Sequence, residues 1–411
     1  MARTKLKLKS IASGTIPGRI KIANENITAG SVDSDAMGAG AITGPKLSAF
    51  AQRGGGNKNF AHNGAMRVAQ RGTQTSQGNA EALTAVDRWK IMGANTAGRL
   101  STIQQAVTDL PGFTKCLRLD CTTADTSIAA NEYMLLEQRF EGQDLQTLLY
   151  NTASAKTLTF SFYVKGNAAA TYSFTWQYQP AGGVARWYTK SVPVTTSWNR
   201  VSITVPGDTD DGADHGIDDD NVGRANAIFW LHGGTNFSSG THVDGGWADR
   251  DYTKTLAEGA TSFFDSTDRL FEITGFQVEF GPVATEFEHE PFDKTFNKCL
   301  RYYQKTYDYA RAPGYSASST SSHTRMFLNN RNPGHGHAYG QFQKRMRAAP
   351  TITHYNPYDG SVNEMSNYDG TAGDNSGSNI SRIGEEGYTA YTNSTSLGHF
   401  IAWHFTADSE L

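Results

Sequence analysis

The chain has 411 residues, of which 38% are hydrophobic and 19% are charged, and its net charge is −3. Nothing in a net charge this close to neutral points to nucleic acid, so we expect no nucleic-acid partner. No stretch approaches the roughly 18 consecutive apolar residues of a membrane helix, so we expect no membrane insertion either.

The length predicts about two or three domains. The chain is rich in Gly, Thr, Ser and aromatic residues, which favours many short strands over long helices, and we therefore predict an all-β protein. Its three cysteines are Cys116, Cys121 and Cys299. Their odd number and their spacing fit neither a disulfide framework nor a zinc site, so we predict reduced, buried thiols.

Residues 1–56 are rich in small residues and almost free of aromatic ones. They contain a loose repeat, because residues 27–32 (ITAGSV) and 42–47 (ITGPKL) each place a small polar turn between two apolar residues. One such unit buries too little apolar surface to fold alone, whereas three chains wound together cover it mutually. We therefore predict an intertwined, homotrimeric stalk, with a disordered linker as the alternative.

Residues 110–292 carry the clearest period-two pattern. Apolar residues alternate with polar ones in residues 117–121, 158–164, 172–178 and 201–205, as expected for antiparallel strands with one buried face. The phase of the alternation slips at Gly275, which indicates a β-bulge. Strands at this spacing predict a jelly-roll β-sandwich over residues 57–292.

Residues 293–305 change to a helical period. Phe296, Cys299, Leu300 and Tyr303 share one face of a short amphipathic helix, for which Asp293 is the expected N-cap. This predicted helix links the sandwich to a second β domain over residues 306–411, which ends in an alternating strand.

The sequence gives no sign of an active site, so we predict that the chain is not an enzyme. Gly-x-Ser-x-Gly, Walker A and His-Glu-x-x-His patterns are missing. Paired carboxylates for polysaccharide cleavage cannot be recognised from sequence alone.

An acidic loop at residues 208–221 is the candidate metal site. Clustered Asp residues among turn formers supply oxygens of the kind that Ca²⁺ binds, and a cation would relieve their mutual repulsion. The alternative is a solvated acidic loop without a metal, so Ca²⁺ is the one possible cofactor. The candidate ligands are Asp208, Asp210, Asp211, Asp214, Asp218, Asp219 and Asp220.

Aromatic residues are the candidate ligand-binding groups, since flat rings stack on the C–H faces of sugars. Trp187 and Tyr188 follow a glycine pair at a predicted hairpin, where side chains reach solvent, and Trp247 lies in a Gly- and Asp-rich loop. Trp176 and Tyr178 are weaker candidates, because they share a strand face with other apolar residues and suit a core better.

Several segments, taken in order, resemble a recurrent family of bacteriophage and prophage virion proteins described as tail fibres or carbohydrate-binding structural proteins. The resemblance covers roughly residues 57–411 and implies a carbohydrate-binding-module-like sandwich in a trimeric appendage. Its acidic loop is longer than the family pattern. The matching segments are residues 63–73, 87–89, 122–130, 138–142, 274–281, 284–292, 299–305 and 406–411.

The resemblance implies a tail fibre that attaches the phage to polysaccharide on the host surface. Residues 1–56 would then anchor the trimer to other virion proteins, and the chain would be assembled in the host cytoplasm and located in the virion. The alternatives are a head fibre or capsid decoration protein and, less favoured, a polysaccharide depolymerase.

Overall fold

The computed structural model describes residues 58–210, 216–315, 325–328, 336–368, 374–392 and 400–411. The chain divides into two compact units, Met1–Gly54 and Gly55–Leu411, and all described residues belong to the second. The predicted stalk over residues 1–56 lies outside them, so the trimer stays a prediction.

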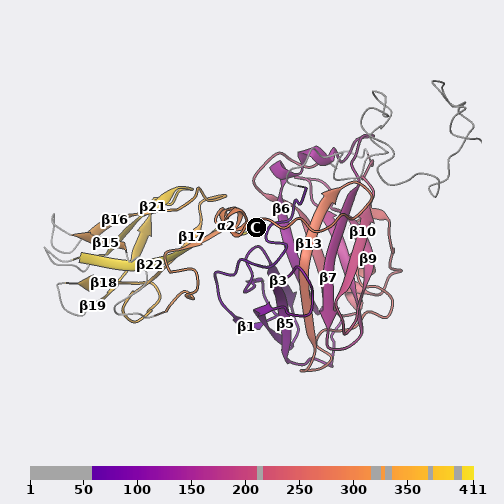
Figure 1. Cartoon of the computed structure of the whole chain (residues 1–411), viewed down its shortest axis with the longest axis horizontal. Coiled ribbons are helices and arrows are strands. Elements are labelled where there is room, and N and C mark those ends of the chain that lie inside the picture. Colours follow the sequence, from indigo (N-terminus) through magenta and orange to yellow (C-terminus); the bar gives the residue numbers. More distant parts are fainter. Residues whose placement is uncertain (1–57, 211–215, 316–324, 329–335, 369–373, 393–399) are drawn as a thin grey trace, which may run out of the picture. The chain divides into compact units, whose positions relative to one another are not determined.

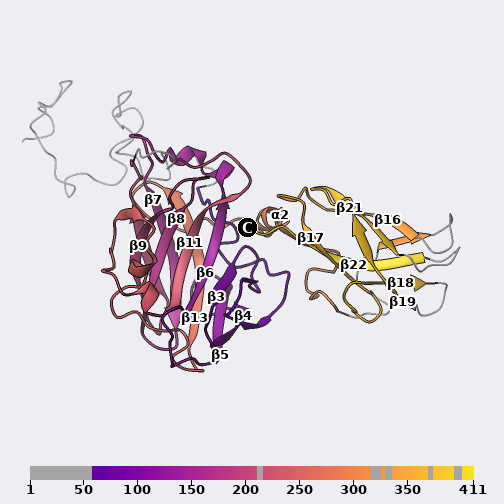
Figure 2. The ribbon, with the colours of Figure 1, turned by 180° about the vertical axis from the view of Figure 1, so that it is seen from behind.

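Two antiparallel sheets form a sandwich (Figure 1), which confirms the predicted all-β class. Sheet A contains, in spatial order, β1 (Gln74–Gln77), β4 (Arg99–Ala106), β5 (Lys115–Thr123), β13 (Leu270–Phe280), β7 (Leu158–Gly166) and β10 (Asn199–Val205). Sheet B contains β12 (Trp247–Asp249), β9 (Arg186–Val194), β8 (Ala170–Tyr178), β11 (Gly223–Gly233), β6 (Tyr133–Glu141), β3 (Lys90–Ala94) and β2 (Ala82–Leu83). Figure 2 shows β8, β11 and β6 side by side in sheet B.

The core lies between the two sheets and is built from the predicted alternating faces. Phe160 and Phe162 of β7 meet Phe174 and Trp176 of β8, and all four are fully buried. The ring centroid of Phe160 lies 5.0 Å from that of Phe174 and 5.1 Å from that of Trp176. Each such ring contributes roughly 1.5–3 kcal/mol by leaving water. The three cysteines are also buried and free, as predicted.

The predicted β-bulge is confirmed at Gly275. The pairing of β13 with β7 shifts register between Thr274 and Gln277, and Gly275 has a φ of +64°. A Cβ at this position would lie 2.9 Å from the rings of Phe113 and Tyr163. Only glycine satisfies both the positive φ and the close approach.

The linking helix is shorter than predicted. Helix α2 (Phe292–Cys299) follows Pro291, which takes the N-cap position, while Asp293 lies in the first turn and does not cap the helix. Tyr303–Lys305 forms strand β14, which pairs with β22 (Phe400–Asp408), so the prediction of helix to residue 305 is wrong. Tyr303 fits the helical spacing of residues 296–303, but its backbone forms hydrogen bonds with β22. This distant strand pairing therefore determines its conformation.

The C-terminal β domain is built around β22, which pairs with four strands of the described region. Its core includes Met346, Met365, Trp403 and Phe405. Its remaining strands are β15 (Arg325–Leu328), β16 (Gly336–Gln341), β17 (Thr351–Tyr355), β18 (Glu364–Tyr368), β19 (Asp374–Gly377), β20 (Asn379–Ser381) and β21 (Gly387–Thr392).

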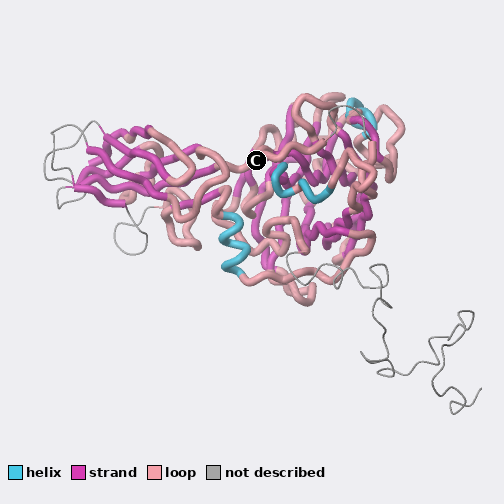
Figure 3. Tube along the Cα trace, turned by 90° about the horizontal axis from the view of Figure 1, so that it is seen from above, coloured by secondary structure: helices cyan, strands magenta, loops and turns pink. Residues whose placement is uncertain are grey.

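Helices make up little of the structure. Figure 3 shows the helical turns in cyan against the strands in magenta. The short 3₁₀ turns of the sandwich are η4 (Gly142–Asp144), η5 (Gln146–Leu148), η6 (Thr235–Phe237) and η7 (Tyr252–Lys254). Among the described residues, none of the helices is long and apolar enough to cross a membrane.

Candidate functional site

The expectation that Trp187 and Tyr188 are exposed is wrong. The predicted hairpin exists, with Gly182 at a φ of +77°, but both rings belong to β9 and are only 3% and 7% exposed. Tyr252 covers Trp187, with ring centroids 5.8 Å apart. Tyr188 points into the core and donates a hydrogen bond to the carbonyl of Thr204. Neither ring offers a free face to a sugar.

The two weaker aromatic candidates, Trp176 and Tyr178, are core residues, as the alternative interpretation of their strand face predicted. Trp176 and Tyr178 are fully buried, and their polar atoms bond to Tyr150 and Asp208. Trp247 is half-buried, packs edge-on against this cluster and donates its indole N–H to the main chain. These three residues therefore stabilise one end of the sandwich.

In the first part of the acidic loop, Arg186 forms ion pairs with the carboxylates of Asp208 and Asp210. Asp208 is buried and accepts hydrogen bonds from Arg186 at 2.9 and 3.2 Å and from the Tyr178 hydroxyl at 2.9 Å. Arg186 also lies 3.2 Å from Asp210 and 2.8 Å from Asp249. Asp208 is thus a buried ion-pair partner, with both oxygens directed at protein donors.

The second half of the loop pairs with another arginine. Arg224 Nε lies 3.1 Å from both carboxylate oxygens of Asp220 and 3.6 Å from Asp218, while Asp219 is exposed. Asp211 and Asp214 lie outside the described residues. In the part of the chain that the structure covers, no three His, Cys, Asp or Glu residues gather as a metal site. Ca²⁺ in this loop stays a prediction.

The outer face of sheet B carries a polar row that sequence reasoning missed. Gln177 on β8, Asn226 on β11 and Arg139 on β6 are register neighbours, with Trp187 next in line on β9. All three polar residues are half-buried and alternate with core residues, so they face away from the sandwich interior. We call Gln177, Asn226 and Arg139 the sheet B row.

Glu137 fixes two members of this row. Its carboxylate is 1% exposed and accepts hydrogen bonds from Arg139 Nε at 2.7 Å and Asn226 Nδ2 at 3.1 Å. Lys90 Nζ lies 3.9 Å away. Burial raises the pKa of Glu137, although Arg139 and Lys90 act in the opposite direction. The carboxylate therefore holds an amide and a guanidinium in set orientations at the surface.

The ring of Tyr252 borders the sheet B row next to Trp187. Tyr252 is 46% exposed and packs edge-on against both Trp187 and Trp230, while the guanidinium of Arg250 lies 5.1 Å from its ring centroid. This face thus combines a partly exposed ring with oriented hydrogen-bonding groups.

A sequence signal for this face exists in β11. Residues 225–231 (ANAIFWL) are apolar at both odd and even positions, which indicates a strand covered on both faces. Asn226 is the one polar residue in that run. Its partners on β6 and β8 could not be assigned without the strand register.

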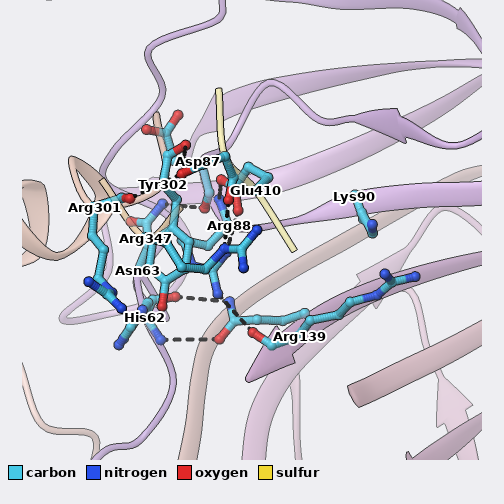
Figure 4. A network of polar contacts seen from close by, with 12 residues as sticks. His62, Asn63, Asp87, Arg88, Lys90, Arg139, Arg301, Tyr302, Arg347 and Glu410 are labelled. Atoms are coloured by element: carbon cyan, nitrogen blue, oxygen red, sulfur yellow. Dashed lines mark hydrogen bonds and ion pairs between the residues drawn. The ribbon is translucent and has the colours of Figure 1, made fainter. Parts of the chain in front are cut away.

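A buried polar network that includes Arg139 of the sheet B row (Figure 4) connects the sandwich to the end of the C-terminal domain. Arg88 donates a hydrogen bond to the Arg139 carbonyl at 2.8 Å and forms an ion pair with Glu410. The guanidinium of Arg88 also lies 3.4 Å from the ring centroid of Tyr302. Burial acts to raise the pKa of Glu410, but Arg88 and Arg71 together hold it below its usual value.

Comparisons with known proteins give likenesses of fold. No protein-family model and no curated protein matches the chain. A family 4 carbohydrate-binding module is 14% identical, with a TM-score of 0.28, over 53% of this chain and 98% of that one. A family 11 module of a Clostridium thermocellum cellulase is 12% identical, with a TM-score of 0.25, over 52% and 100%. The enzymatically active domain of tailspike protein 4 from bacteriophage CBA120 is 9% identical, with a TM-score of 0.28, over 55% of this chain and 22% of that one.

Proposed function

We propose that the sandwich binds a surface glycan at the sheet B row, as part of a bacteriophage tail fibre that attaches to its bacterial host. The observation that carries the binding proposal is the placement of Asn226 and Arg139. Both are half-buried, both are oriented by Glu137, and both lie on the face that Tyr252 borders.

The chemistry of this face suits a sugar. Amide and guanidinium groups donate to hydroxyl oxygens in fixed directions, and a tyrosine ring offers a flat apolar surface at low entropic cost. Because Glu137 already orients Asn226 and Arg139, less conformational freedom is lost on binding.

The tail-fibre role draws its support from the ordered sequence resemblance across residues 57–411. One shallow site of this kind binds weakly, near 1 mM or about −4 kcal/mol. Trimerisation through residues 1–56 and several fibres on one particle would multiply weak contacts into stable attachment. No step of this role requires catalysis.

The binding proposal is tested with Asn226→Ala and a matched control, Ser202→Ala, which removes an exposed hydroxyl from β10 in the other sheet. Binding of full-length protein to purified host-surface polysaccharide is measured by biolayer interferometry. We expect Asn226→Ala to weaken binding at least about fivefold, or about 1 kcal/mol, and the control to leave it unchanged. Equal binding by Asn226→Ala and the parent protein would remove this face from the site.

The virion role needs a separate measurement. Gold-labelled antibody against the C-terminal domain should decorate tail appendages in electron micrographs of intact particles. Label confined to the head would exclude the tail fibre, and a particle without label would exclude the virion role altogether.

A further inference from the structure

The most exposed tyrosine of the described C-terminal domain is Tyr339. It lies in β16, at one edge of the three-stranded sheet β16–β21–β20, and is 61% exposed. Its strand neighbours Ala338 and Gly340 face the domain core, so Tyr339 faces outward. A ring this exposed is not used in packing within the described chain, so its outer face is open to a ligand.

Glycine lets the Tyr339 ring lie against the sheet. A Cβ on Gly387 would stand 2.3 Å from the Tyr339 hydroxyl oxygen and 2.5 Å from its Cζ, so any side chain at 387 would lift the ring. On the inner face of the sheet, the tyrosine is on β21 and the glycine is on β16. There the ring of Tyr388 lies across Gly340, where a Cβ would stand 2.2 Å from that ring. The Tyr339 ring is therefore supported from below by backbone, and its other face is exposed.

The residues in the same row as this ring are neutral and polar. Strand pairing places Tyr339, Thr389 and Ser381 in one row across β16, β21 and β20. Thr389 and Ser381 are half-buried and lie on the same face of the sheet as Tyr339. A flat ring in a row with two hydroxyl groups and no charged residue matches a neutral sugar ring better than an ionic ligand.

We propose that the outer face of β16–β21–β20 is a second saccharide-binding surface, with Tyr339 as its stacking platform and the hydroxyl groups of Thr389 and Ser381 as its hydrogen-bonding partners. It is separate from the sheet B row and does not depend on that site. With both sites on one chain, a polysaccharide would be held at two places, which raises avidity without any tighter single contact.

Full-length protein tests this proposal by saturation-transfer difference NMR with a panel of neutral methyl hexopyranosides and N-acetylhexosaminides. We expect at least one sugar to receive saturation through its ring C–H protons. Tyr339→Ala should lower that signal at least about fivefold, whereas Tyr339→Phe, which keeps the ring, should stay within about twofold. Tyr315→Ala removes another exposed tyrosine of this half of the chain and should change nothing.

Three outcomes would overturn the proposal. The first is a panel in which no sugar receives saturation, and the second is an equal signal from Tyr339→Ala and the parent protein. The third is dissociation of an oligomer by Tyr339→Ala, measured by light scattering, which would assign the face to a second copy of this chain. Asn226→Ala separates the two sites, because loss of the sheet B row should leave the Tyr339-dependent signal intact.

Discussion

The carboxylate of Glu410 accepts hydrogen bonds from both the backbone N–H and the guanidinium of Arg88, which lies 322 residues earlier in the chain. Arg71 adds a second guanidinium 3.5 Å away, and the side chains of all three residues are at most 7% exposed. The end of the C-terminal domain is thus held to the sandwich by a buried ion cluster.

The first prediction is that Glu410→Gln costs roughly 3–5 kcal/mol of unfolding free energy, because it leaves the buried guanidinium of Arg88 without its carboxylate partner, while Arg71 keeps Asp87 and Asp408. Urea unfolding followed by tryptophan fluorescence measures the loss. Glu385→Gln is the control, since it breaks an exposed pair with Arg345 and should cost under about 1 kcal/mol. Equal losses in the two variants would contradict the cluster's role.

The second prediction is acid sensitivity of the C-terminal domain. Burial lowers the pKa of His354 to about 3 and that of His404 to about 4. Both are neutral in the fold, so their contribution is complete above the unfolded pKa of about 6.5 and is lost as pH falls toward 3–4. At pH 4.5, each should have lost roughly 2–3 kcal/mol.

The pH dependence is measured by urea unfolding between pH 7 and pH 4.5, with the double variant His354→Gln and His404→Gln for comparison. The variant should show a flatter dependence than the parent protein, whatever its absolute stability. Parallel curves for the two proteins would show that other groups control the acid response.

The third prediction follows from the burial of Trp187. Trp187→Ala should cost about 3–5 kcal/mol, as large core deletions do, because it removes the surface on which Tyr252 packs. Trp198 is half-buried near the start of β10, and Trp198→Ala should cost about 1 kcal/mol. Guanidinium unfolding measures both losses, and a Trp187 variant as stable as the Trp198 variant would mean that the ring is not a core element.

The fourth prediction concerns the acidic loop. Asp208→Asn should lower stability by roughly 2–3 kcal/mol, because Arg186 loses its buried partner while Asp210 and Asp249 remain. Asp219→Asn, at an exposed position, should have no effect. The loss should be the same with excess Ca²⁺ and with EDTA, as measured by differential scanning fluorimetry. A stability loss on Asp208→Asn that is seen in Ca²⁺ and disappears in EDTA would instead indicate that Asp208 binds a cation.

Sequence pattern predicted the elements whose environment is local. The alternation around Phe160 and the phase slip at Gly275 both reflect a side-chain period of two, so strands, core faces and bulge followed from it. Tyr303 fits a helical spacing equally well, and only the distant strand β22 decides its conformation.

The candidate site depended on contacts that the local sequence does not contain. The position of Trp187 after a hairpin was predicted correctly, but its exposure depends on Tyr252, which is 65 residues away and covers the ring. Asn226 and Arg139 become neighbours only through the register of β11 on β6. Sequence therefore indicated the kinds of residue that a glycan site uses, while tertiary packing selected which of them reach the surface.

Strand β22 has a consequence for how the chain is made. It pairs with β14, β15, β17 and β18, and every one of them precedes it in the sequence. During translation these four strands leave the ribosome before their common partner exists, whereas the sandwich is already complete. The nascent C-terminal domain therefore exposes unpaired edges until β22 emerges, so a chain interrupted before β22 should be prone to aggregation.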